Sequence, residues 1–151
     1  MKSIENKQTL KNIFDQIDVS IHKWSNYFEI YENYMSEYRG KSPNFLEIGV
    51  QYGGSLKMWN KYFRNGKING IDINPDCKSL ESGNIKIHIG SQNDRNFLNS
   101  FANKTKDFDI IIDDGGHTME QQLNSFEILF PKVKNGGIYI VEDTESSYQN
   151  M

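Results

Sequence analysis

The sequence predicts an α/β protein with a Rossmann-like, three-layer fold around a parallel sheet of five strands in the order 3-2-1-4-5. Short apolar runs that resemble strands alternate with amphipathic runs that resemble helices, which is typical of parallel βαβ units. The runs NFLEIGV and FDIII are nearly continuous in apolar residues, which fits a sheet covered on both faces. Glycines and acidic residues gather where such runs end, and open parallel sheets bind ligands at that edge.

The N-terminal part is expected to be helical. Residues 4–18 and residues 23–38 both place apolar or aromatic side chains at helical spacing. We interpret most of the aromatic residues in the second segment as a face that packs on a core. Residues 1–40 are therefore expected to form a helical lead-in, and residues 41–151 a Rossmann-like core, within one domain overall.

The core is expected to alternate strands with helices. The expected strands cover residues 44–50, 67–73, 84–89, 108–112 and 137–141. The expected helices cover residues 55–63, 94–102 and 119–130, and Pro131 ends the last of them.

Composition narrows the functional class. The 151 residues suit one domain, and the net charge of -3 with a pI of about 5.6 argues against a binder of nucleic acid or acidic membranes. Cys77 is the single cysteine of the sequence, so an internal disulfide is impossible. The N-terminus has no apolar signal core, and no apolar run approaches the length of a membrane span. A cytoplasmic protein is expected.

Three polar clusters follow the first three strands. The stretch from Glu47 to Ser55 has the pattern G-x-x-x-G-G, which fits a plain tight turn about as well as a cofactor cradle. Asp72 taken alone is better explained as a turn or N-cap acid before Asn74 and Pro75, but it also stands at the distance expected of an acid that binds ribose hydroxyls. Ser91 and Gln92 could face an adenine or could cap the next helix.

Acidic residues also follow the fourth and fifth strands. If these strands are neighbours, Asp114, Glu142 and Asp143 converge, and several carboxylates at one edge repel each other unless a cation compensates. Oxygen ligands favour a hard cation such as Mg²⁺, although each acid alone could simply cap a turn or a helix. His117 would overhang the same edge, and an imidazole, which exchanges protons near neutral pH, suits a general base.

Four motifs in this order resemble the metal-dependent sugar O-methyltransferases of macrolide and polysaccharide tailoring, of the mycinamicin and macrocin type. The motifs are LEIGVQYGGSLKMW, INGIDINP, IIDDGGH and GGIYIVEDTESSY. The segment HKWSNYFEIYENY is similar to the part of these enzymes that precedes the first strand, and cephalosporin hydroxylase-type proteins share the core pattern. The resemblance covers roughly residues 20–148.

This resemblance implies S-adenosylmethionine and Mg²⁺ as cofactors and a sugar or glycoside as the acceptor. The cofactor residues it implies are Glu47, Gly49 and Gly53 at the methionine and ribose, Asp72 at the ribose hydroxyls, Ser91 and Gln92 near the adenine, and Asp113 near the methionine end. The Mg²⁺ ligands it implies are Asp114, Glu142 and Asp143, and the base is His117. His117 would take the proton of the sugar hydroxyl while the enzyme orients the two reactants.

The sequence departs from this family in two places. It reads DDGGH where the family usually has DDGSH, and it ends eight residues after Asp143, where the family normally continues with two more strands. The core is therefore expected to lack the last two strands, and the open edge of the fifth strand favours a homo-oligomer or a missing C-terminal part. A truncated S-adenosylmethionine-binding module is the main alternative. A nicotinamide-dependent oxidoreductase is disfavoured because G-x-G-x-x-G is missing.

Overall fold

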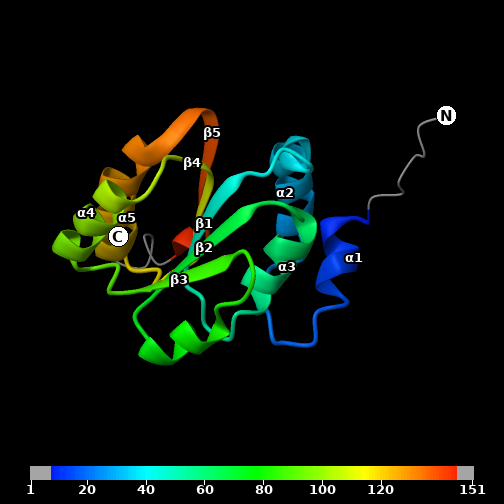
Figure 1. Ribbon diagram of the computed structural model, residues 1–151, viewed down its shortest axis with the longest axis horizontal. Helices are drawn as coiled ribbons and strands as arrows, with labels where there is room; N and C mark the ends of the chain where they lie inside the picture. The colour runs from blue at the N-terminus through cyan, green and yellow to red at the C-terminus, as the bar shows by residue number, and fades with distance from the viewer. Residues whose placement is uncertain (1–7, 146–151) are drawn as a thin grey trace.

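The computed structural model describes residues 8–145 as a sheet with helices on both of its faces (Figure 1). The strands are β1 (Asn44–Ile48), β2 (Lys67–Asp72), β3 (Ile85–Ile89), β4 (Phe108–Asp113) and β5 (Val133–Val141). The α-helices are α1 (Leu10–Phe14), α2 (Tyr27–Met35), α3 (Gly54–Tyr62), α4 (Arg95–Lys104) and α5 (Met119–Leu129). Within the described residues, every helix is too short or too polar to cross a membrane.

The five strands are parallel and lie in the order β3-β2-β1-β4-β5, which confirms the predicted topology. β1 lies in the middle, where Ile48 pairs with Ile71 of β2 on one side and with Asp113 of β4 on the other. The chain reverses its direction of travel across the sheet between β1 and β4. Ligands of such folds bind in the crevice outside the strand ends at this point.

Two apolar cores hold the predicted three layers together, one on each face of the sheet. Successive side chains of a strand point to opposite faces, so Phe45 and Leu46 of β1 belong to different cores. The core around Phe45 joins the sheet to α1, α2 and α3, and its largest buried side chain is Trp59. The core around Leu46 joins the sheet to α4 and α5. Figure 1 shows these two helix layers on opposite sides of the strands.

The N-terminal helices are shorter than the sequence pattern predicts. α1 ends at Phe14, and residues 4–7 of the expected helix lie outside the described part of the chain. Residues 19–21 instead pack against Gly54, where the carbonyl oxygen of Ser20 lies 2.6 Å from the place a Cβ would occupy. A continued helix would carry residues 19–21 away from Gly54. The close contact is possible because Gly54 has no Cβ.

The second predicted helix begins later than expected, at Tyr27, because Lys23 extends toward the sheet edge in an irregular segment. The aromatic face was a correct prediction for Tyr31, which is buried, but wrong for Trp24 and Tyr34, which are 64% and 61% exposed. A short 3-10 turn, Ser36–Tyr38, follows α2. Helical spacing alone could not separate these cases, because it does not show where the helix starts.

The last strand is longer than predicted. β5 begins at Val133 rather than at residue 137, and its register against β4 shifts between Phe108 and Ile110. Gly136 has a φ of +76° within the shifted part. Such an irregularity with a left-handed glycine is typical of a β-bulge. Residues 134–137 (KNGG) are polar and rich in glycine, so their sequence does not indicate a strand. The remaining strand and helix limits agree with the predictions to within two residues.

Candidate functional site

A cavity of about 930 Å³ opens at the carboxyl edge of the sheet. Loops after β1, β2, β3 and β4 form most of its walls, and residues 20–23 of the N-terminal segment, Gln121 of α5 and Asp143 after β5 also contribute. The size lies in the range of sites that enclose small cofactors. The cavity therefore occupies the place that the strand order predicts.

The turn after β1 needs glycine at two positions. Gly49 has a φ of +94°, and a Cβ there would lie 2.1 Å from the backbone oxygen of Asp114. Gly53 has a φ of +76° and is the residue before the first turn of α3. Both conformations are readily available to glycine and costly for other residues. The first glycine therefore brings the β1 turn against the β4 loop, and the second turns the chain into the helix.

Asp72, at the end of β2, holds this turn in place. One of its oxygens, Oδ2, accepts hydrogen bonds from the backbone N–H groups of Val50 at 2.8 Å and Gln51 at 2.9 Å. Oδ1 accepts one from the N–H of Asn74 at 2.8 Å. Asp72 also lines the cavity. The side chain thus acts as a turn acid here, and it stands where the predicted ribose role would place it.

Gln92 and Asp113 form a buried polar pair beside the cavity. Nε2 of Gln92 donates to both carboxylate oxygens of Asp113, at 2.7 and 2.9 Å, and Oε1 of Gln92 accepts from the N–H of Gly116 at 3.0 Å. Burial raises the pKa of Asp113 to about 6, while hydrogen bonds from Ser125 and Gln92 oppose the rise. Gln92 therefore fixes the loop after β4 as well as lining the cavity.

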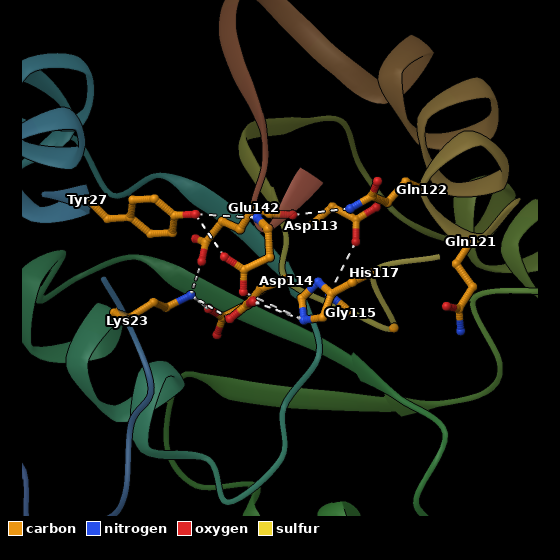
Figure 2. Close-up of polar contacts among 12 residues, drawn as sticks. Lys23, Tyr27, Asp113, Asp114, Gly115, His117, Gln121, Gln122 and Glu142 are labelled. Carbon is orange, nitrogen blue, oxygen red and sulfur yellow. Dashed lines mark hydrogen bonds and ion pairs between the residues drawn. The ribbon is translucent and has the colours of Figure 1, made fainter. Parts of the chain in front are cut away.

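Asp114, His117 and Asp143 gather at one side of the cavity. Each offers a ligand atom, and these atoms all lie within 4.8 Å of one another. Nε2 of His117 lies 3.9 Å from Oδ1 of Asp114 and 3.9 Å from Oδ2 of Asp143 (Figure 2). His117 and Asp143 both have a left-handed φ, +55° and +51°. Non-glycine residues adopt this region rarely, and such strain is concentrated at functional sites.

Glu142 is not a member of this group, although it precedes Asp143 in the chain. Its side chain is 3% exposed, and its oxygens accept hydrogen bonds from Lys23 Nζ, at 2.8 Å, and from the hydroxyl of Tyr31. Burial raises the pKa of Glu142 to about 7, although the ammonium of Lys23 acts against the rise. Of the three predicted Mg²⁺ ligands, Asp114 and Asp143 thus share the group with His117, and Glu142 stands next to it.

Lys23 brings a buried positive charge to these acids. Its side chain is 1% exposed, and Nζ lies 2.7 Å from Oδ2 of Asp114 and 3.4 Å from Oε1 of Glu47. Glu47 is fully buried, and it also accepts hydrogen bonds from Ser55 Oγ and Trp59 Nε1. Burial lowers the pKa of Lys23, but the three surrounding carboxylates outweigh this effect, so the pKa is raised overall.

The structure brings most of the predicted site residues to the cavity. The predicted residues that line it are Gly49, Asp72, Ser91, Gln92, Asp114, His117 and Asp143. The predicted residues that stand behind the wall, although all lie within residues 8–145, are Glu47, Gly53, Asp113 and Glu142. Their cofactor and metal roles remain predictions.

Sequence reasoning missed Lys23 and Tyr27. Both contact the acidic group, and both lie in the segment interpreted as a packed aromatic face. A usable signal existed for Tyr27, because Tyr27 and Tyr31 are four residues apart on α2 and place two hydroxyls on one side of the helix. Lys23 lies before the helix, so helical spacing does not point to it.

Known proteins are similar to this chain in sequence and in fold. A family model described as a methyltransferase domain matches residues 46–144. A tetracenomycin 3'-O-methyltransferase of Streptomyces olivaceus, which acts on 8-demethyl-8-(2-methoxy-alpha-L-rhamnosyl)-tetracenomycin C, is 39% identical over 83% of this chain and 34% of its own length. Demethylmacrocin O-methyltransferase of Streptomyces fradiae is 41% identical over 78% of this chain and 31% of its own length. The chain thus spans about a third of the length of these relatives.

A solved structure extends the likeness to three dimensions. The MycE methyltransferase of mycinamycin biosynthesis, in complex with Mg, SAH and mycinamycin VI, superposes with a TM-score of 0.87 at 33% identity. The match covers 96% of this chain and 39% of MycE. Since the family model covers residues 46–144, which include most of β1, all of β2 to β5 and the whole acidic group, this chain belongs to the methyltransferase-domain family.

Proposed function

We propose that this chain carries the cofactor-binding and metal-binding part of an O-methyltransferase that uses S-adenosylmethionine and Mg²⁺ and acts on a sugar hydroxyl of a glycoside. The observation that carries the proposal is the group of Asp114, His117 and Asp143 at the wall of a cofactor-sized cavity. The names of the relatives support a glycoside acceptor, and the MycE complex supports the two cofactors.

The cavity fits S-adenosylmethionine in size and in lining. Gly49 lines the cavity, and the backbone of Asp114 leaves no room for a Cβ there, so the turn contributes backbone to this part of the wall. Such backbone approach is what glycines after the first strand provide in nucleotide-binding α/β folds. Asp72 would receive the ribose hydroxyls, and Ser91 and Gln92, which line the cavity after β3, would face the adenine.

The acidic group fits a hard divalent cation. Asp114 and Asp143 present carboxylate oxygens on one side of His117, and Mg²⁺ prefers oxygen ligands. Glu142, the residue before Asp143, would join Asp114 and Asp143 as a third ligand by turning its carboxylate from Lys23 toward the cation. Carboxylates brought this close favour a cation, because it offsets their repulsion.

His117 would carry the proton transfer. When bound, Mg²⁺ would polarise the acceptor hydroxyl, and S-adenosylmethionine would supply the methyl group. Nε2 of His117 would accept the hydroxyl proton as the acceptor oxygen attacks the sulfonium methyl and S-adenosylhomocysteine leaves. Asp114 and Asp143, each 3.9 Å away, would stabilise the imidazolium that forms. The buried walls behind the group would keep the two reactants in one orientation, which is a large part of such catalysis.

Two measurements test this function. Isothermal titration of the chain with S-adenosylhomocysteine should show binding, and methyl transfer from labelled S-adenosylmethionine to a glycoside panel should stop with EDTA. His117→Gln should remove transfer while preserving cofactor binding, and His88→Gln, a matched change on β3 outside the cavity, should preserve both. Transfer that survives EDTA would refute the metal role.

A binding module is the second candidate, because the chain spans about a third of its relatives' length. It predicts cofactor binding with an intact acidic group but no transfer to any glycoside. Comparison of the two results on one preparation separates the candidates, since binding is common to both and turnover is not.

A further inference from the structure

The segment before the sheet supplies hydrogen-bond donors to the acidic group. Lys23 Nζ donates to Oδ2 of Asp114 at 2.7 Å, and the hydroxyl of Tyr27 donates to Oδ1 of Asp143 at 2.8 Å. Figure 2 shows Lys23 and Tyr27 reaching the acids from one side, with His117 on the other. These donors lie 91 and 116 positions away in the sequence from the acids that they contact.

In each contact, Lys23 or Tyr27 binds one oxygen of the carboxylate, and the other oxygen faces His117. In Asp114, Oδ2 contacts Lys23 while Oδ1 lies 3.9 Å from Nε2 of His117. In Asp143, Oδ1 contacts Tyr27 while Oδ2 lies 3.9 Å from the same nitrogen. A carboxylate held by one oxygen cannot rotate freely, so the second oxygen keeps a fixed direction.

Tyr27 also holds the backbone of the acid that it contacts. The N–H of Asp143 donates to the hydroxyl of Tyr27 at 3.4 Å, and Asp143 has the strained φ of +51°. The hydroxyl thus bridges the side chain and the backbone of the same residue. Strained conformations persist where their surroundings fix them from several sides.

We propose that Lys23 and Tyr27 are positioning residues of the divalent-cation site, which hold Asp114 and Asp143 with one oxygen of each turned to the cation. This inference rests on the proposed function, because it assumes that the acidic group binds metal. Residues that hydrogen-bond to metal ligands orient them, and their loss typically weakens metal affinity about 10- to 100-fold. The N-terminal segment is then part of the metal site and not only a cover for the core.

The decisive variant is Tyr27→Phe, which removes one hydroxyl and little else. Tyr38→Phe is the matched control, because its hydroxyl donates at 2.9 Å to the backbone oxygen of Gly136, near the start of β5, whereas Asp143 follows the end of that strand. The affinity for Mn²⁺ is measured by electron paramagnetic resonance and that for Mg²⁺ by isothermal titration. S-adenosylhomocysteine affinity and the melting temperature are measured on the same samples.

Tyr27→Phe should weaken Mn²⁺ and Mg²⁺ binding by about 10-fold or more while the S-adenosylhomocysteine affinity stays within about twofold, and Tyr38→Phe should change neither. Unchanged metal affinity in Tyr27→Phe would overturn the positioning role and leave the proposed function standing. A wild-type chain that binds S-adenosylhomocysteine but neither cation would overturn the metal site and this inference together.

Discussion

Lys23→Met should destabilise the metal-free protein strongly. Met has nearly the same length as Lys, so the change removes the ammonium with little loss of packing. The side chains of Lys23, Glu47 and Glu142 are 1%, 0% and 3% exposed, so the carboxylates lose their cation without gaining water. Breaking a buried ion pair by removing one partner costs about 3–5 kcal/mol of unfolding free energy.

That loss of unfolding free energy can be measured as a fall in the melting temperature, Tm. For a chain of this size, about 1 kcal/mol shifts Tm by roughly 2–4 °C, so Tm should fall by about 6–20 °C in calorimetry with EDTA. Burial already raises the pKa of Glu142 to about 7, and protonation removes the stranded charge. The deficit should therefore be larger at about pH 8 than at about pH 6, because the carboxylate is ionised at the higher pH.

An exposed ion pair provides the control. Lys41 lies 3.1 Å from Glu37, with side chains 60% and 66% exposed, so Lys41→Met should cost less than about 1 kcal/mol. Adding Glu142→Gln to Lys23→Met should recover part of the loss, because one stranded charge disappears. A Lys23→Met protein as stable as Lys41→Met at both pH values would refute the reasoning that Lys23 compensates buried charge.

Three further predictions concern the loops and β3. Gly49→Ala should lower Tm and weaken S-adenosylhomocysteine binding in titration, since a Cβ would lie 2.1 Å from the backbone oxygen of Asp114 and the φ of +94° disfavours alanine; native values would contradict this contact. Gln92→Ala should lower the free energy of unfolding in urea by about 1–3 kcal/mol, because the buried carboxylate of Asp113 loses the amide that donates to both of its oxygens. A loss below about 0.5 kcal/mol, as for a surface substitution, would show that another donor replaces the amide. His88 has its pKa lowered, mainly by burial. The unfolded state therefore takes up the proton more readily, and stability should fall as pH drops below about 6.5. Urea midpoints of wild type and His88→Gln should converge or cross there, and parallel pH curves would contradict the assignment.

The core of the fold was predictable because its signals are local. Continuous apolar runs such as Phe108–Asp113 fixed the strands, and Asp94, whose side chain accepts from the N–H groups of Asn96 and Phe97, marked a helix start. The positions of Asp114 and His117 followed from strand order, because parallel strands end at one edge. These parts depend on periodicity and topology, which the sequence displays directly.

The parts that the sequence did not reveal depend on contacts between distant residues. The early end of α1 reflects packing of residues 19–21 on Gly54, and the residues of α1 themselves give no signal for this end. The role of Tyr27 depends on a hydroxyl meeting a carboxylate 116 positions away, while its spacing equally suits a core aromatic residue. Periodicity locates the face of a helix but not the partner that the tip of a side chain will find.

The buried ammonium of Lys23 also bears on how the chain can be divided. A fragment that begins at residue 41 would keep every strand and α3, α4 and α5, and it would look like a complete nucleotide-binding fold. It would nevertheless leave Glu47 and Glu142 facing each other across the space that Lys23 Nζ occupies, and it would uncover the aromatic surface of Trp59 that Tyr31 contacts. A fragment that keeps these contacts therefore has to begin before Lys23, and the residues ahead of the first strand belong to the candidate site together with the sheet.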